Sequence, residues 1–312
     1  MDTIFLKAPA KVNLSLTVLG RRPDGYHEIK SVLQTLDLAD ELAFSLKEPP
    51  QVQVSCRGPW AHQVPAGASN LVFRAATLML EEAERVGPKG PFGARIELLK
   101  FIPAAAGLGG GSSDAACTLK GLNQLWQLGW DQEKLVSLAG ELGSDVPFLV
   151  MGGTALAEGR GEKVRPFVSR LRLSLVLIKP PWGVSTPAVY RDWDMANPAV
   201  NSDKGGDARR QDRERRDPTQ VLIHALEAGD RDRALEAMGN DLEPVTLKMH
   251  PELQEAGQAL LACGATKVML CGSGPTQMGI MDGPEAASRA ARVLKGWFPG
   301  WWVQEACTGE PT

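Results

Sequence analysis

The feature that most constrains the fold of this chain is a glycine-rich loop followed directly by a helical pattern. Four glycines fall at positions 107 and 109–111, and two serines and an aspartate follow them. From Ala115 onward apolar residues recur at helical spacing. Glycine lets the backbone approach a ligand closely, Ser and Asp favour the N-cap and first turn, and a helix N-terminus presents free N–H groups. The segment therefore predicts a phosphate-binding loop.

This loop differs from two familiar phosphate-binding loops. A P-loop needs Gly-Lys followed by Ser or Thr, and the chain contains no Gly-Lys pair. The dinucleotide fingerprint needs a third glycine where this chain has Ser112. The segment therefore matches neither of these two loops. Its candidate phosphate-binding residues are Pro103, Ala104, Ala105, Ala106, Gly107, Leu108, Gly109, Gly110, Gly111, Ser112 and Ser113.

Charge and cysteine content exclude several classes of function. The net charge of −3 gives no basis for a nucleic-acid or anionic-membrane partner, and no apolar run approaches the ~20 residues of a membrane span. The first residues lack the pattern of a signal or transit peptide. Five cysteines without a C-x-x-C pair are typical of free thiols in a reducing compartment. We therefore expect a cytoplasmic protein, or one from a compartment like the plastid stroma.

The N-terminal segment predicts a long strand. Within residues 4–19, apolar side chains alternate with polar ones, which is typical of a strand buried on one face. Lys11 and Asn13 lie two positions apart on the polar face, so they point the same way. On spacing alone they are two solvated side chains.

A turn and a second strand follow. Pro23, Asp24 and Gly25 form a turn because Pro fixes φ, Asp caps and Gly takes the unusual dihedral. The turn presents Tyr26 and His27 together, a pair that is incidental on most protein surfaces. Residues 28–46 then predict a further strand.

The remaining elements alternate along the chain and indicate an α+β protein. Asn70 and Asp131 are placed to cap the first two helices outside the glycine loop. Expected helices cover residues 70–86, 132–142, 218–228, 231–238, 251–263 and 284–296, and expected strands cover 94–102, 152–157, 171–178, 267–270, 277–281 and 301–305. The tight turn at 159–162 is where we place the passage between two domains, 1–158 and 159–312.

Two further segments stand out. Asp145 follows Gly-Ser and precedes Val-Pro, so it marks a helix boundary. It is either a cap or a carboxylate beside the phosphate site. Residues 203–217 contain six basic and five acidic residues and no large apolar side chain, so we interpret 199–217 as a mobile charged insertion.

Four of these segments, in this order, resemble the GHMP kinases. They are PAKVNLSL from Pro9, GLGGGSS from Gly107, GSDVPFLV from Gly143, and the glycine turn at 271–276. The segment from Arg22 to Glu28 resembles the branch whose substrate is cytidine diphospho-methylerythritol. The resemblance implies a two-domain fold, with an N-terminal ribosomal-protein-S5-like α/β domain that binds ATP and a C-terminal ferredoxin-like domain.

The resemblance also implies an activity. The expected enzyme is an ATP-dependent small-molecule kinase that uses Mg²⁺, in non-mevalonate isoprenoid synthesis. Asp145 would take the proton of the attacking hydroxyl, and Lys11 would stabilise the developing negative charge. Asn70 and Lys100 match positions beside the adenosine. Ser113 is a candidate Mg²⁺ ligand.

The substrate contacts are likewise implied by the resemblance. Asn13 would contact the erythritol part, and Thr186 would be a further contact. His27 would hydrogen-bond cytosine, while Tyr26 and Tyr190 would stack on its two faces.

The chain departs from the family pattern at 104–106, where three alanines stand in place of a more glycine-rich run. Two alternatives remain open at this point. One is another GHMP kinase, of the homoserine or mevalonate type, and the second tyrosine argues against it. The other is a non-catalytic nucleotide-binding relative, and the presence of both Lys11 and Asp145 argues against that.

Overall fold

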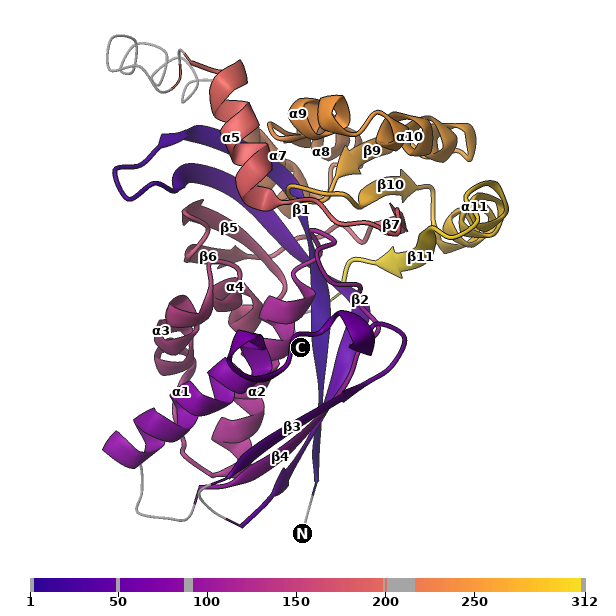
Figure 1. Cartoon of the computed structure of the whole chain (residues 1–312). Helices are drawn as coiled ribbons and strands as arrows, with labels where there is room; N and C mark the ends of the chain where they lie inside the picture. Colours follow the sequence, from indigo (N-terminus) through magenta and orange to yellow (C-terminus); the bar gives the residue numbers. More distant parts are fainter. Residues whose placement is uncertain (1–2, 49–50, 87–91, 199, 201–216, 310–312) are drawn as a thin grey trace.

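The structure of this chain is a computed structural model that describes residues 3–48, 51–86, 92–198, 200 and 217–309 (Figure 1). Its described strands form a seven-stranded sheet and a four-stranded sheet. The strands are β1 Ile4–Arg21, β2 His27–Leu46, β3 Val52–Arg57, β4 Ala94–Leu99, β5 Thr154–Gly159, β6 Lys163–Phe167, β7 Ser174–Lys179, β8 Gly239–Asn240, β9 Lys267–Leu270, β10 Gln277–Met281 and β11 Trp302–Cys307.

The helices cover both sheets. They are α1 Leu71–Val86, α2 Gly110–Leu125, α3 Gln132–Leu142, α4 Val146–Met151, α5 Thr186–Ala196, α7 Pro218–Ala228, α8 Arg231–Ala237, α9 Glu243–Met249, α10 Glu252–Ala262 and α11 Pro284–Trp297. The insertion expected at 199–217 lies outside the described residues, apart from Val200 and Asp217. The side chain of Asp217 caps α7 by accepting a hydrogen bond from the N–H of Thr219.

A long antiparallel hairpin, β1–β2, is the spine of the molecule (Figure 1). Around it the strand order is β3-β4-β2-β1-β8, and β5 pairs with β2 and then with β6. Apolar residues of β2 and β4, such as Phe44 and Ile96, pack against α1, α2, α3 and α4 in one core. The packing is tight, because a Cβ at Gly121 of α2 would lie 2.4 Å from the Phe44 ring.

The expectation that β1 is buried on one face is wrong, because β1 is covered on both. Its apolar residues, including Val12 and Leu14, join a second core with Leu175 and Leu177 of β7. Its polar residues face the other way and are buried too, with Asn13 only 3% exposed. They are tolerated because they bond to one another and to β2.

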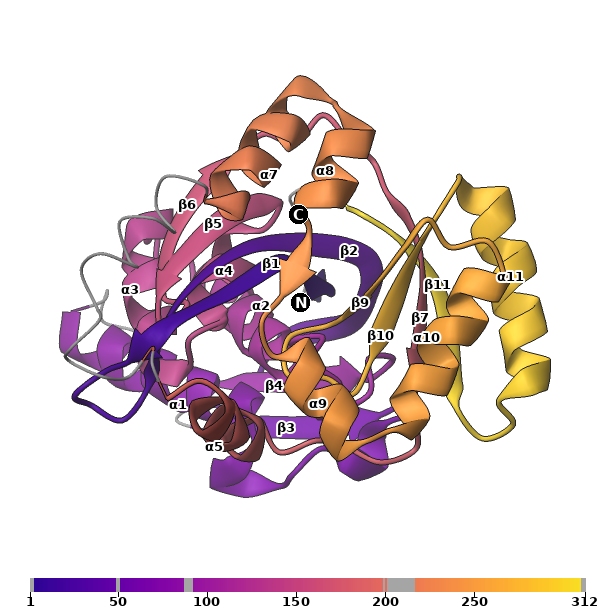
Figure 2. The same cartoon turned by 90° about the horizontal axis from the view of Figure 1, so that it is seen from above.

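The four-stranded sheet has the order β11-β7-β10-β9. One face packs on the hairpin, and the other packs on α10 and α11 through residues such as Val176 and Leu294. Figure 2 shows these two helices on the side of the sheet away from the hairpin. Since both faces are covered, β7 reads as an uninterrupted apolar run, as the sequence predicts.

The passage between the two halves of the chain does not lie at 159–162, as we expected from the sequence. That turn joins β5 to β6, which pairs with β5 in the seven-stranded sheet. The chain leaves this sheet after Phe167 and later returns to it, since β8 pairs in parallel with β1. Strands from both halves of the chain therefore belong to the seven-stranded sheet, and the two halves are not two separate consecutive domains.

The helix after the glycine loop begins at Gly110, before the serines and aspartate that we expected at its N-cap and first turn. Its N-cap is Gly109, with φ of 68°, rather than a serine or aspartate. The second half of the glycine-serine run is therefore the first turn of α2, and its N–H groups point toward the loop.

Candidate active site

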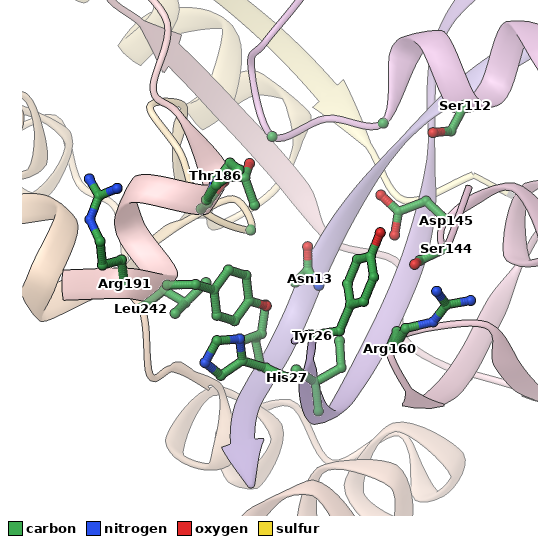
Figure 3. A pocket seen from close by; sticks show the side chains of 18 of the residues that line it. Asn13, Tyr26, His27, Ser112, Ser144, Asp145, Arg160, Thr186, Arg191 and Leu242 are labelled. Atoms are coloured by element: carbon green, nitrogen blue, oxygen red, sulfur yellow. The ribbon is translucent and has the colours of Figure 1, made fainter. Parts of the chain in front are cut away.

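A cavity of about 830 Å³ opens where the hairpin, the glycine loop, α5 and the turn at 271–276 meet (Figure 3). In this view Ser112 and Asp145 lie at one end, His27 and Arg191 lie at the other, and Tyr26 lies between them. The residues predicted from the sequence that line the cavity are Lys11, Asn13, Tyr26, His27, Gly107, Gly109, Ser112, Asp145, Thr186 and Tyr190.

Glycines shape the phosphate end of the cavity. Gly107 has φ of 78°, and a Cβ on it would lie 2.1 Å from the carbonyl oxygen of Cys271. A Cβ on Gly109 would lie 2.8 Å from Cγ of Lys11. The backbone N–H of Lys11 donates to the carbonyl of Leu108, at 2.9 Å. The loop is thus held between β1 and the turn at 271–276, with the N-terminus of α2 behind it.

We expect Gly107→Ala to weaken ATP binding and lower stability, because the added methyl group meets a backbone carbonyl that cannot move freely. Positive φ in a residue with a side chain costs about 1–2 kcal/mol by itself, and the clash adds to that cost. The checks are urea unfolding and the KM for ATP.

Gly129→Ala is the matched control, since Gly129 has φ of 67° but no atom within 4 Å of a built Cβ. It carries the conformational cost without the clash, so its KM for ATP should not change. If the two substitutions changed ATP binding equally, Gly107 would have no specific role in binding the phosphates.

The remaining residues of the glycine loop do not line the cavity, and they keep the loop in its conformation. These residues are Pro103, Ala104, Ala105, Ala106, Leu108, Gly110, Gly111 and Ser113. The N–H of Ala104 donates to Oε1 of Gln63, at 3.0 Å. Ala105 takes φ of 48°, a conformation that glycine adopts more easily. The run of alanines, where the family pattern has more glycine, therefore carries local strain.

Lys11 and Asp145 face each other inside the cavity. Nζ of Lys11 lies 3.4 Å from Oδ2 of Asp145 and donates to Oδ1 of Asn13 at 2.8 Å. Nδ2 of Asn13 in turn donates to Oγ of Ser31, at 2.8 Å. Asp145 starts α4, but its side chain makes no capping hydrogen bond. Of the two interpretations of Asp145, the structure therefore favours a carboxylate in the site over a helix cap.

Aromatic side chains form the other end. The Tyr26 ring is exposed and has the Arg160 guanidinium 4.8 Å from its centroid. Tyr190 stacks on His27 with centroids 4.5 Å apart and planes at 25°. Nε2 of His27 lies 2.7 Å from Oδ1 of Asp194. Burial, and then the charge of Asp145, raise the pKa of the Tyr190 phenol.

The second glycine turn approaches the site, as the resemblance implied. Gly272 and Ser273 line the cavity. Oγ of Ser273 is hydrogen-bonded to Oγ1 of Thr186, at 2.7 Å. Since Thr186 begins α5, this bond joins the turn to the helix that carries Tyr190.

The side chains of Asn70 and Lys100 do not line this cavity, and their assignment to the adenosine stays a prediction. Oδ1 of Asn70 accepts from the N–H of Val72 at the start of α1. Lys100 is 2% exposed, and its ammonium group is paired with Asp40 and Asp114. Both side chains are engaged within the protein.

The sequence reasoning missed several cavity residues. Arg21, Arg160 and Arg191 add positive charge to that of Lys11, against the carboxylates of Asp145 and Asp194. Such a balance suits an anionic ligand. Further lining residues that were missed are Ser144, Asp194 and Leu242.

The two serines of the glycine loop differ in their exposure to the cavity, and Ser113 as a Mg²⁺ ligand stays a prediction. Ser113 is 1% exposed, and its Oγ has no hydrogen-bond partner among the described residues, whereas Ser112 lines the cavity. Within the described ranges no cluster of His, Cys, Asp or Glu could hold a metal alone. Mg²⁺ prefers one or two protein oxygens together with substrate phosphates, so the hydroxyl of Ser112 is a candidate ligand beside that of Ser113. A separate observation concerns membranes: none of the described helices is long and apolar enough to cross one.

Two family models match this chain in sequence order. The model described as the GHMP kinases N terminal domain matches residues 70–153. The model described as GHMP kinases C terminal matches residues 222–300.

Curated relatives are similar over most of the chain. A 4-diphosphocytidyl-2-C-methyl-D-erythritol kinase of Pelotomaculum thermopropionicum is 44% identical over 284 residues, which cover 91% of this chain and 91% of that protein. A protein of the same name from Moorella thermoacetica is 43% identical over 300 residues, covering 96% and 97%.

Solved structures share the fold. A crystal structure of 4-(cytidine 5'-diphospho)-2C-methyl-D-erythritol kinase has a TM-score of 0.75 and 35% identity, covering 98% of this chain and 100% of that one. A homoserine kinase from Cytophaga hutchinsonii has a TM-score of 0.72 and 20% identity, covering 100% and 96%. At that identity the second likeness concerns the fold alone.

Proposed function

The chain belongs to the GHMP kinases, in the family of 4-diphosphocytidyl-2-C-methyl-D-erythritol kinases, and we propose that its cavity transfers a phosphoryl group from ATP to the 2-hydroxyl of that substrate. The reaction serves the non-mevalonate synthesis of isoprenoid precursors. One observation carries the proposal. A single cavity joins a helix N-terminus with a glycine loop, a lysine–aspartate pair, and an aromatic end large enough for a base.

Lys11 and Asp145 would have different roles in the reaction. Phosphoryl transfer depends mostly on positioning and charge stabilisation. Asp145 would accept the proton of the attacking hydroxyl, since its side chain is partly exposed to the cavity. Lys11 would stabilise the charge that develops on the transferred group. Asn13 fixes the Lys11 ammonium through their 2.8 Å hydrogen bond and would also contact the erythritol part.

ATP is the phosphoryl donor, as in other GHMP kinases. Its phosphates would lie at Gly107, Gly109 and Ser112, against the N-terminus of α2. Mg²⁺ would neutralise charge on the phosphates when bound, with Ser113 or its neighbour Ser112 as a protein ligand.

The test is a kinase assay on the purified full chain. ADP release is measured with ATP, Mg²⁺ and, in separate reactions, the cytidine diphospho-substrate, mevalonate or homoserine. We expect turnover with the cytidine substrate alone. Turnover with one of the other two, or with none, would overturn the proposal.

We expect Tyr190→Ala to raise the KM for the cytidine substrate by roughly 5- to 150-fold, because stacking on a base is worth about 1–3 kcal/mol. The KM for ATP should stay unchanged, since Tyr190 lies at the opposite end of the cavity from the glycine loop. Tyr190→Phe keeps the ring and is the control, with a KM close to that of the original enzyme. A folded alanine variant with an unchanged KM would show that Tyr190 does not stack on the base.

The proposal also includes a role for each half of the chain and a cellular compartment. The N-terminal half would carry ATP and the C-terminal half would close over the substrate, with the division after Phe167 instead of residue 158. All five cysteines are free, which agrees with a reducing cytoplasm. No nucleic-acid partner is proposed for a chain of net charge −3.

A further inference from the structure

We propose that the segment from Asn240 to Thr246 holds the turn at 271–276 in place and so sets the position of that turn against Lys11. This makes Asn240 and Thr246 positioning residues for phosphoryl transfer, although neither side chain lines the cavity. The inference rests on the proposed function, because its kinetic consequence is measured on the transfer step.

The Asn240 amide binds the backbone of the turn on both sides of Cys271. Its Nδ2 donates to the carbonyl oxygens of Leu270 and Gly272, at 2.9 and 2.7 Å. Its Oδ1 accepts from the N–H of Leu242, at 3.0 Å. Because a backbone N–H can only donate, this last bond fixes which end of the amide faces the turn. Both ends of the Asn240 side chain are therefore engaged, and both amide hydrogens are used on the turn.

Two side chains of α9 add further bonds to the same stretch of backbone. Oε2 of Glu243 accepts from the N–H of Leu270, at 2.7 Å. Oγ1 of Thr246 donates to the carbonyl oxygen of Ser273, at 3.3 Å. Thr246 is 0% exposed, so water cannot replace this bond. One short segment therefore holds the backbone groups of residues 270, 272 and 273 through three different side chains.

The same segment is fixed to β1, the strand that carries Lys11. Strand β8 pairs in parallel with β1, and Leu16 lies opposite Asn240. The N–H of Asp241 donates to the carbonyl oxygen of Leu16, and Oδ2 of Asp241 accepts from the N–H of Val18, both at 2.9 Å. The backbone of Asn240 is thus held on the strand of Lys11, while its side chain holds the turn.

The turn in its place lies against the groups that act in the reaction. A Cβ built on Gly272 would lie 3.4 Å from Oδ1 of Asn13 and 3.8 Å from Nζ of Lys11. The carbonyl oxygen of Cys271 meets Gly107 so closely that a Cβ there would lie 2.1 Å away. A displacement of about 1 Å can cost on the order of 10²-fold in rate. A shift of the turn would therefore disturb both the Lys11 ammonium and the glycine loop.

Asn240→Ala in the full chain tests the proposal through two measurements. With ATP and the cytidine substrate, at a temperature where the variant is folded, kcat should fall by roughly 10- to 100-fold. Amide hydrogen exchange, followed by mass spectrometry of peptides that cover 266–280, should become faster in the turn. An unchanged kcat, or an unchanged exchange rate in the turn, would overturn the inference.

Asn123→Ala is the matched control. Nδ2 of Asn123 donates to the carbonyl oxygen of Trp130 at 2.9 Å, and its Oδ1 accepts from the N–H of Trp130 at 3.1 Å. The side chain thus makes the same kinds of bond as Asn240, but it does not line the cavity or touch the turn. Its loss should lower the melting temperature without changing kcat or the exchange of the turn. A fall in kcat equal to that of Asn240→Ala would mean that both asparagines act through stability alone.

Two variants of Thr246 separate the hydroxyl from the shape of the side chain. Thr246→Val keeps the shape and loses the donor, so kcat should fall by roughly three- to tenfold. Thr246→Ser keeps the donor and loses a buried methyl group, so kcat should stay within about twofold although stability falls. A purely structural residue would instead lose kcat in step with the melting temperature in both variants. If Thr246→Ser loses as much kcat as Thr246→Val, the hydroxyl does not position the turn.

Failure of this inference and failure of the proposed function give different results. Hydrogen exchange is measured without turnover, so it reports on the turn whether or not the cytidine substrate is phosphorylated. If the original chain phosphorylates no cytidine substrate while Asn240→Ala still speeds exchange in the turn, the proposed function fails alone. If the original chain is active and the variants at 240 and 246 keep its kcat, this inference fails alone.

Discussion

Replacing Asp145 with asparagine is expected to lower kcat by roughly 10²–10⁴-fold, the usual contribution of a positioned general base. The amide of asparagine cannot accept the proton of the attacking hydroxyl. The substitution keeps the shape of the side chain, and Asp145 makes no capping bond that α4 would lose. ATP binding and thermal stability should therefore remain close to those of the original chain. The measurements are kcat, the KM for ATP and a thermal melt.

Asp131→Asn is the control for this substitution. Asp131 caps α3 by accepting from the N–H of Lys134 at 2.8 Å, and it does not line the cavity. Asparagine is also a good N-cap, so neither kcat nor stability should change by much. A kcat for Asp145→Asn near that of the original enzyme would reduce Asp145 to a residue at a helix boundary.

Elements with a strong period could be located from the sequence. The alternating run of β1, the apolar run of β7 and the capped helix α3 lie close to where the patterns place them. Short elements gave no such signal. The helix α9 has seven residues, and β6 is mostly exposed and contains Pro166. Likewise α5 buries only Val189 and Trp193, so its apolar period is too weak to detect.

The candidate site shows a different limit. Local pattern left Lys11 as a solvated side chain and Asp145 as either a cap or a carboxylate beside the phosphate site, and only the family resemblance brought them together. Pairs that form between distant segments leave no local trace. His27 and Asp194 are 167 residues apart in the chain, and nothing in the sequence between them indicates their contact. Likewise no local pattern reveals the two carboxylates that enclose Lys100.

These carboxylates make Lys100 the buried anchor of the glycine loop. The Lys100 ammonium pairs with Asp40 of β2 and lies 2.6 Å from Oδ2 of Asp114 in α2. Oδ1 of Asp40 accepts from the N–H groups of Phe101 and Ile102, at 2.5 and 2.8 Å, where β4 ends and the loop approach begins. The cluster therefore joins the segments on both sides of the loop to the central hairpin.

We expect Asp40→Asn to lower the free energy of unfolding by about 3–5 kcal/mol, the usual cost of breaking a buried ion pair from one side. The asparagine amide would place N–H donors against a lysine and two backbone donors, and one of these groups would lose its acceptor. The loop would lose its alignment as well, so the KM for ATP should rise. Urea unfolding at pH 7 and steady-state kinetics measure the two effects.

The matched variant Asp114→Asn should behave differently, because the two carboxylates are not equivalent. Among the described residues no donor reaches Oδ1 of Asp114, while Asp40 has three donors. Burial, together with the charge of Asp40 and against that of Lys100, raises the pKa of Asp114 to about 8. The raised pKa favours the protonated form in the folded chain, and asparagine resembles that form. Stability should change by less than about 1 kcal/mol.

The pH dependence of Asp114→Asn has a definite sign. The folded chain holds the Asp114 proton more tightly than the unfolded chain, in which the pKa of this carboxyl is near its ordinary value of 3.8. The stability that this proton provides is complete below about pH 4 and is lost as the pH rises through about 8. The asparagine side chain does not titrate, so in urea unfolding the variant should gain stability relative to the original chain as the pH rises from about 4 to 8, and the difference should level off above pH 8. A loss at pH 7 as large as that of Asp40→Asn, or a difference that does not vary with pH, would mean that Asp114 carries the charge that Lys100 needs.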